Sequence, residues 1–213
     1  MTMESEAVAG KPEGVRGELH EMSQQTVEML ELAWKGFRKQ YRGPLELAEK
    51  LGREVHQREK ALTKLVVKKS ADQAGTPEAD QELFLVPMHL ERIGDNIEFL
   101  IKAIGTMVRG GILFTDQETA EVNALFEQAI GLVECVRDVI RTKNSVLLKH
   151  MLEEGHRYEE TANEYTLFHQ QRLVKGVGMP RASSVYVAIV DYFKGIGSHA
   201  CQIAQKLSAD ATP

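Results

Sequence analysis

One spacing pattern of apolar residues, called the frame below, occurs twice in this chain, at residue numbers that differ by 103. Under this shift Ile93-Gly94 falls on Ile196-Gly197, and no gap is needed. Apolar stripes of any two helices can be superimposed by chance, but the same shift also matches glycine with glycine and proline with proline. These matches are Gly52 with Gly155 and Pro77 with Pro180. The frame therefore predicts a duplicated unit, which restricts the chain to folds built from two similar halves.

The residues around the frame have the spacing of long helices. Apolar residues alternate three and four positions apart at Leu83, Val86, Leu90, Ile93, Ile97, Leu100, Ile104 and Met107. This spacing is typical of a helix packed in a near-parallel bundle, and similar stripes recur along the chain. Strand-like alternation of β-branched residues is almost absent. We therefore predict an all-α fold of six long helices, arranged as two tandem three-helix bundles.

Turn residues and polar segments set the predicted boundaries. Residues 70–76 break the helical pattern before Pro77, and Thr115 with Glu118 forms a helix-starting capping box. The flanks of the chain are polar and small, which predicts disorder. The predicted parts are a disordered tail at 1–17, a first repeat at 18–110, a second repeat at 111–207 and a disordered tail at 208–213.

Charge and composition argue against two classes of function. The 213 residues carry a formal net charge of -5, so no basic excess is present to neutralise nucleic-acid phosphates. No apolar run approaches the roughly 18–20 residues of a membrane span, and the N-terminus lacks a signal peptide's apolar centre. We expect a cytoplasmic protein that meets a membrane only through a partner, with Cys135 and Cys201 as buried thiols.

Two carboxylates in the first copy of the frame are the candidate binding residues. Glu91 and Asp95 lie four positions apart, which places them on one helix face with Cβ atoms roughly 5–6 Å apart. Both can then reach one cation, although Arg92, Lys102 or a solvated surface would also balance their charges. Further candidates are Glu98 on the same helix and His56 and Glu59 on the preceding one. An imidazole among carboxylates suits iron, zinc or nickel better than calcium.

The stretch Leu90-Glu91-Arg92-Ile93-Gly94-Asp95-Asn96-Ile97 resembles the signature of PhoU, the phosphate-uptake regulator family. Helices of that family carry acid-x-x-x-Asp motifs in a Glu-Arg-Ile-Gly-Asp context, and the length and tandem repeat also agree. The resemblance implies two three-helix bundles, a homodimer, and metal clusters held on the bundle surface by the acidic motifs. It also implies restraint of phosphate transport through a partner, either a phosphate transporter subunit or a sensor kinase.

The second half departs from this pattern. Lys194 and Ser198 stand where the first half has acids, and Gly52 and Gly155 replace the first acid expected on the preceding helices. The departures make a complete metal cluster in each half doubtful. A second acidic group consists of Glu159, Glu160 and Glu164. We hypothesise that Lys194 pairs with this group in place of a metal.

No Ser/His/Asp or Cys/His grouping can be argued from the sequence, so we expect no enzyme. We predict a regulator of inorganic phosphate transport and phosphate-starvation signalling that acts by protein–protein contact, with a candidate metal site at Glu91 and Asp95. Two alternatives stay open: a cytoplasmic partner of a sodium-phosphate cotransporter, and a helical scaffold unconnected with phosphate. A metal-dependent enzyme built on a bundle ranks below both. Deletion of the gene separates regulator from scaffold, because only loss of a regulator derepresses phosphate uptake.

Overall fold

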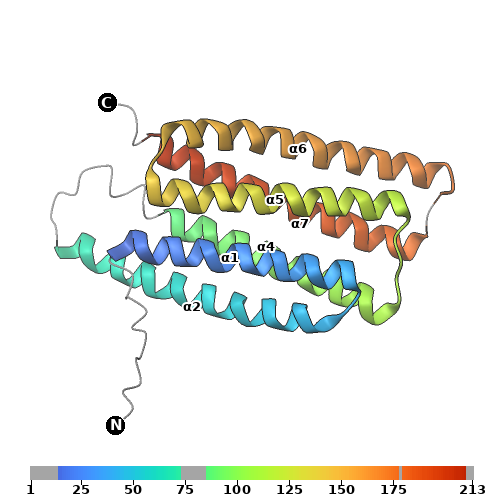
Figure 1. Cartoon of the computed structure of the whole chain (residues 1–213), viewed down its shortest axis with the longest axis horizontal. Helices are drawn as coiled ribbons and strands as arrows, with labels where there is room; N and C mark the ends of the chain where they lie inside the picture. The colour runs from blue at the N-terminus through green and yellow to red at the C-terminus, as the bar shows by residue number, and fades with distance from the viewer. Residues whose placement is uncertain (1–13, 73–84, 178, 210–213) are drawn as a thin grey trace, which may run out of the picture.

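The computed structural model describes residues 14–72, 85–177 and 179–209, and it is all-α over these ranges (Figure 1). The described helices are α1 (Gly14–Lys39), α2 (Arg42–Asp72), α4 (Leu85–Gly110), α5 (Asp116–Thr142), α6 (Ser145–Val174) and α7 (Pro180–Ala209). Consecutive helices run in opposite directions with their axes nearly parallel. None of these helices is both long enough and apolar enough to cross a membrane.

Each half of the chain forms a three-helix bundle. Helices α1, α2 and α4 pack on one another, and α5, α6 and α7 do the same. The two bundles are joined along α1–α5 and, most extensively, along α4–α7, which leaves α2 and α6 on the outer flanks (Figure 1). The predicted all-α fold with two tandem three-helix bundles is therefore confirmed.

A single apolar core runs through both bundles. On α4 the predicted stripe is buried along its described length, from Val86 to Met107, whereas Leu83 lies outside the described residues. The outer helix α6 places Tyr158 in this core, and the Tyr158 hydroxyl donates a hydrogen bond of 3.1 Å to the Phe193 carbonyl on α7. Burial of each stripe against its neighbours supplies the main stabilising free energy of such a bundle.

Helix ends follow the predicted turn chemistry, with corrections at both tails and at residues 70–72, where α2 continues to Asp72 instead of breaking at residue 70. Thr115 caps α5, and its backbone N–H donates to the Glu118 carboxylate at 2.9 Å, which confirms the capping box. Helix α1 begins at Gly14 and α7 ends at Ala209, so the predicted tails at 1–17 and 208–213 are too long. The helical pattern there continues through residues too small or polar to show an apolar stripe. Two terminal ranges, 1–13 and 210–213, lie outside the described residues. So do residues 73–76 of the predicted break, together with Pro77.

The duplicated glycines mark the same helix crossing in both halves. A Cβ on Gly52 of α2 would lie 2.7 Å from Glu98 Oε1 of α4, and a Cβ on Gly155 of α6 would overlap Cys201 Sγ of α7. Glu98 and Cys201 are themselves related by the 103-residue shift. The second pair of glycines behaves alike: Gly94 faces Val55, and Gly197 faces the Tyr158 ring. The repeat seen in the sequence is thus a repeat of close α2–α4 and α6–α7 contacts.

Candidate functional site

The predicted acidic site lies on the surface between α2 and α4. Glu91, Asp95 and Glu98 of α4 face His56 of α2 around a pocket of about 170 Å³. The pocket is possible because Gly52 and Gly94 also line it and bring the two helices close together. Four of the five predicted ligands therefore line one pocket. Helical spacing indicated this for the three acids of α4, and the packing of α2 on α4 adds His56.

Arg92 contacts the two central carboxylates and offsets part of their charge. Its Nη1 donates to Asp95 Oδ2 at 3.2 Å, and its Nε lies 3.8 Å from Glu91 Oε2. On the other side of the pocket, His56 Nδ1 lies 3.5 Å from Glu91 Oε1. Burial raises the pKa of Glu91, and the negative charge of Asp95 raises it further against the opposing effect of Arg92. The site is a carboxylate pair already held by a guanidinium.

The remaining predicted ligands are engaged elsewhere. Glu98 Oε2 lies 3.6 Å from Lys102 Nζ one turn further along α4. Glu59 accepts a hydrogen bond of 2.7 Å from the Thr63 hydroxyl on the exposed side of α2 and does not line the pocket. Glu59 therefore acts on Glu91 only through space, where its charge contributes to the raised pKa of Glu91.

This arrangement does not fit a metal ion as it stands. Among the residues that the structure describes, no group of three or more His, Cys, Asp and Glu side chains is placed to hold one together. A cation at Glu91 and Asp95 would compete with the Arg92 guanidinium, which contacts both carboxylates with one positive charge against their two negative charges. Binding of iron, zinc or nickel at these residues therefore stays a prediction.

The hypothesis of a lysine bridge in the second half is wrong. Lys194 Nζ donates to the Thr166 hydroxyl at 3.0 Å and lies 3.9 Å from Asp191 Oδ1 on its own helix. These contacts engage the ammonium group away from the acids proposed as its partners, which are Glu159, Glu160 and Glu164. The exchange of a metal for a lysine does not describe this half of the molecule.

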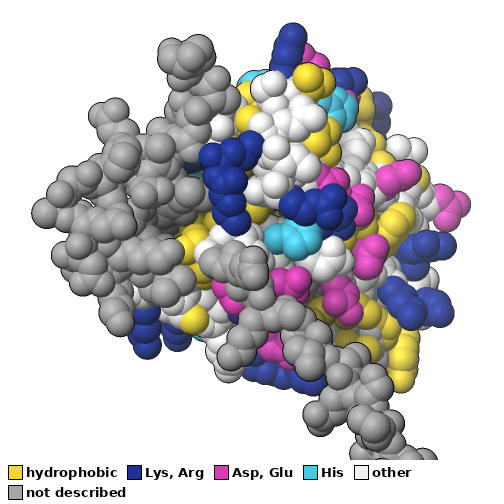
Figure 2. Space-filling model, turned by 60° about the vertical axis from the view of Figure 1, so that its left-hand side comes forward, with side chains coloured by type: hydrophobic (Ala, Val, Ile, Leu, Met, Phe, Trp, Pro, Cys, Tyr) yellow, Lys and Arg dark blue, Asp and Glu magenta, His cyan; other side chains and the backbone are white. Residues whose placement is uncertain are grey.

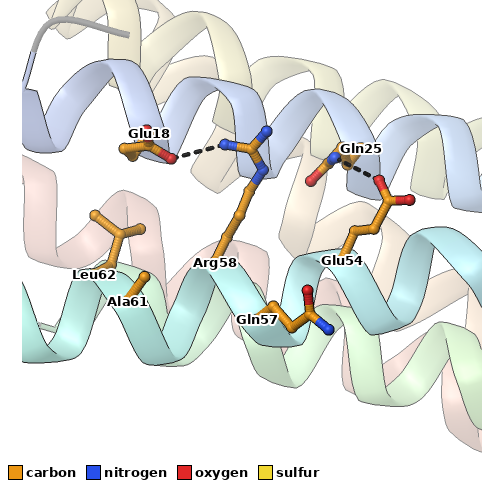
Figure 3. Close-up of a pocket in the computed structure, with 7 residues that line it drawn as sticks. All are labelled: Glu18, Gln25, Glu54, Gln57, Arg58, Ala61 and Leu62. Carbon is orange, nitrogen blue, oxygen red and sulfur yellow. Dashed lines mark hydrogen bonds and ion pairs between the residues drawn. The ribbon is translucent and has the colours of Figure 1, made fainter. Parts of the chain in front are cut away.

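A larger pocket of about 540 Å³ lies between α1 and α2 (Figure 3). Arg58 of α2 crosses it and donates to Glu18 of α1 at 2.7 Å. Further along, the Gln25 side-chain amide of α1 donates to Glu54 of α2 at 3.3 Å. Both carboxylates that line this pocket already have a partner, so the polar contacts tie α1 to α2.

A buried polar network at one end of the second bundle was missed by the sequence reasoning. The Glu121 carboxylate of α5 accepts hydrogen bonds of 2.8 and 2.7 Å from the two Nη atoms of Arg172 on α6, and another from the Tyr186 hydroxyl of α7. Burial acts to raise the pKa of Glu121, but these hydrogen bonds lower it below its usual value. One signal was available, because Glu121 stands four positions before Leu125 on the apolar stripe of α5.

Next to it, a serine, a histidine and a glutamate come together in the order of a catalytic triad. The Ser183 hydroxyl lies 2.8 Å from His169 Nε2, and His169 Nδ1 lies 3.2 Å from Glu118 Oε1. His169 is only 1% exposed and stacks on Tyr186 with ring centroids 4.4 Å apart. Burial lowers the pKa of His169. An imidazole so enclosed cannot meet a substrate, so these residues link α5, α6 and α7 structurally.

A pair of histidines also joins the two halves at the α4–α7 contact. His89 Nδ1 and His199 Nδ1 lie 3.2 Å apart, a distance at which one ring donates and the other accepts a hydrogen bond. Burial lowers the pKa of both rings. His199 and then Lys206 lower the pKa of His89 further, and Arg92 lowers that of His199 against the opposing effect of Asp95. These causes favour the neutral form of both rings.

The fold matches solved structures over nearly the whole chain. PhoU from Pseudomonas aeruginosa aligns with a TM-score of 0.82 at 16% identity, covering 93% of this chain and 96% of that one. The phosphate transport system regulatory protein PhoU from Streptococcus pneumoniae gives 0.81 at 10% identity, covering 93% of each chain. A putative PhoU-like phosphate regulatory protein from Shewanella oneidensis gives 0.63 at 14%, covering 92% and 98%.

These likenesses are visible in the fold and not in overall sequence similarity. No protein-family model matches the chain, and no curated protein matches its sequence. Identities of 10–16% with solved structures leave the arrangement of the helices as the shared property. The motif around Glu91 and Asp95 and the duplicated helix frame resemble PhoU, and the structure agrees: this chain is PhoU-like in fold, from the first described helix to the last.

Proposed function

We propose that this protein regulates inorganic phosphate transport and phosphate-starvation signalling by binding another protein, with no catalytic step. The observation that carries the proposal is the full-length match to PhoU from Pseudomonas aeruginosa, at a TM-score of 0.82 over 93% of the chain. Shared fold alone is an argument by analogy, because one fold can host several functions. The Glu91–Asp95 motif, set in the same sequence context as in PhoU, adds a specific argument.

The proposed partner is a phosphate transporter subunit or a sensor kinase, and the proposed state is a cytoplasmic homodimer. The α2–α4 face is the first candidate for the contact. There a half-buried carboxylate, Glu91, is held by Arg92 and His56 through contacts of 3.5–3.8 Å that a charged partner group can replace. If a charged group of the partner replaces Arg92 or His56, Glu91 still has a charged neighbour in the complex. The exchange therefore does not leave a half-buried carboxylate unpaired.

A direct binding measurement tests this proposal. Purified protein would be titrated by calorimetry into purified subunits of the host's phosphate transporter and into its phosphate sensor kinase. We expect saturable binding to one of them, weakened at least tenfold by Asp95→Arg. The matched control is Asp138→Arg, a half-exposed acid on α5 that also lies beside an arginine. Absence of binding to both proteins would remove the proposal.

In this proposal a metal ion binds Glu91 and Asp95 only if it displaces Arg92 from them. Elemental analysis would compare the wild type with Glu91→Ala/Asp95→Ala and with Arg92→Gln. If the acidic pair takes iron, zinc or nickel, Arg92→Gln raises the metal content and the double variant loses it. Equal content in all three proteins would remove metal from the account without touching the protein–protein contact.

A further inference from the structure

Three turns of the chain meet at one end of the bundle. They are the turn between α1 and α2, the loop between α4 and α5, and the connection between α6 and α7 (Figure 1). A pocket of about 360 Å³ is lined by Gln40 of the first turn and Leu113 of the second. Arg181, after the third turn, reaches Gly110 at the start of the second, where a Cβ would lie 3.1 Å from its guanidinium. The turns therefore form one continuous surface.

Large apolar side chains project from each of these turns into solvent. Val174 is 90% exposed, and Leu113 and Met179 are each 73% exposed. Tyr41 and Val177 are also more than half exposed. The side chains come from separate turns and stand singly at a blunt end, whereas a protein-binding surface is usually a contiguous apolar core with a polar rim.

The turns that carry these exposed apolar side chains, called the apolar tips below, are also rich in basic residues. The segments 35–46, 109–116 and 172–181 contain eight Lys or Arg and only two Asp or Glu, although the whole chain has a net charge of -5. Arg172, one of the eight, is already held by Glu121 of α5, which leaves seven basic side chains for this surface. One of the two acids, Glu46, lies 3.6 Å from Arg42 and is compensated. In contrast, acidic and basic side chains are mixed on the face in Figure 2, which brings the opposite end of the bundle forward. The positive charge is thus concentrated at the end that bears the tips.

We infer that this end of the molecule binds an anionic lipid surface directly. The apolar tips would enter the headgroup region, and the lysine and arginine side chains around them would contact lipid phosphates. Membrane binding without a spanning helix becomes stronger with the apolar area inserted and with electrostatic attraction to anionic lipids, and this end of the molecule offers both. This inference goes beyond the expectation that the protein meets a membrane only through a partner. Binding through this end would leave the long axis of the bundle pointing away from the membrane surface.

Vesicle co-sedimentation of the full chain tests the inference. The probes are phosphatidylcholine vesicles with and without phosphatidylglycerol, and we expect binding only to the anionic vesicles. Charge reversal by Lys39→Glu and Lys175→Glu should lower the partition coefficient at least about 25-fold, at about fivefold for each lysine charge. Replacing two tips by Val174→Ser and Met179→Ser should lower it about tenfold or more.

Matched controls lie at the opposite end of the bundle. Val146 lies in the first turn of α6 and is 74% exposed, so Val146→Ser is the control for loss of an exposed valine. Lys149→Glu, one turn further along, tests charge reversal. Circular dichroism would confirm that each variant keeps its helix content.

Three results would overturn the lipid assignment. They are absence of binding to anionic vesicles, equal binding to both vesicle types, and equal loss of binding in the control variants. In the first case the basic end would instead be a site for an acidic protein. The vesicles contain neither transporter nor kinase, so failure here leaves the proposed regulatory function to its own test.

Discussion

Gly155 on α6 is the position where the duplicated frame makes its sharpest energetic prediction. A Cβ at this position would overlap Cys201 Sγ on α7, so Gly155→Ala must push α6 and α7 apart or turn the Cys201 side chain. Overpacking by one methyl group in a tight contact costs about 1–3 kcal/mol. The same substitution gains about 1 kcal/mol of helix propensity, because glycine is a poor helix former.

The net expectation is a loss of about 1 kcal/mol in the free energy of unfolding, or about 2–4 °C in melting temperature for a chain of this size. The contrast with Gly131→Ala on α5 makes the prediction sharp. Gly131 has no neighbour within 4 Å of an added Cβ, so the alanine there should stabilise the protein by up to about 1 kcal/mol. The two substitutions are chemically identical, and the expected signs are opposite.

Urea unfolding followed by circular dichroism provides the assay. The double variant Gly155→Ala/Cys201→Ala completes a thermodynamic cycle in which removal of the sulfur makes room for the methyl group. We expect a favourable coupling of about 1 kcal/mol or more between the two substitutions. If Gly155→Ala stabilises the protein as much as Gly131→Ala, either the Cys201 side chain turns aside at no cost or the close α6–α7 contact does not exist, and the predicted overpacking is refuted in both cases.

Three further predictions concern charged and titrating groups. Arg172→Met should destabilise the protein by about 3 kcal/mol in urea unfolding, because the buried Glu121 keeps its hydrogen bond from Tyr186 but loses its positively charged partner. Arg42→Met, which breaks an exposed pair with Glu46, should cost less than about 1 kcal/mol. The pKa values of His89 and His199 are lower in the folded chain than in the unfolded chain, so below about pH 6.5 the unfolded chain binds more protons than the folded chain. Stability should therefore fall between pH 7.5 and 5.5, and fall less in His199→Asn; an unchanged slope would exclude the pair as its origin. Glu91→Gln should stabilise the protein at pH 7, since the folded state disfavours the ionised carboxylate, and its advantage should shrink as the pH falls through the raised pKa of Glu91. A loss of stability at pH 7 would contradict this sign.

Local rules predicted most of the fold. The stripe from Val86 to Met107, the capping box at Thr115 and the duplicated glycines each depend on residues within one helix or on one fixed shift. All of them appear in the structure as expected. The helix at Gly14 was missed because its first turn carries no apolar periodicity, and tertiary packing of the rest of α1 extends it.

The candidate site was only half predictable for a related reason. Helical spacing places Glu91 and Asp95 on one face, but it does not say that Arg92 reaches both carboxylates. The histidine pair and the buried network join residues that are 110 and 51–65 positions apart in the chain. Such contacts depend on which helices lie side by side and in what register, and one helix's periodicity carries no information about either.

Uptake of radiolabelled phosphate tests the regulatory claim most directly. The gene would be deleted in its host, and uptake measured in cells grown with ample phosphate, with a strain that carries the gene on a plasmid as control. We expect uptake to rise in the deletion strain and to return to the wild-type rate when the gene is restored. Equal uptake in all three strains would contradict it and leave a helical scaffold protein with the PhoU fold.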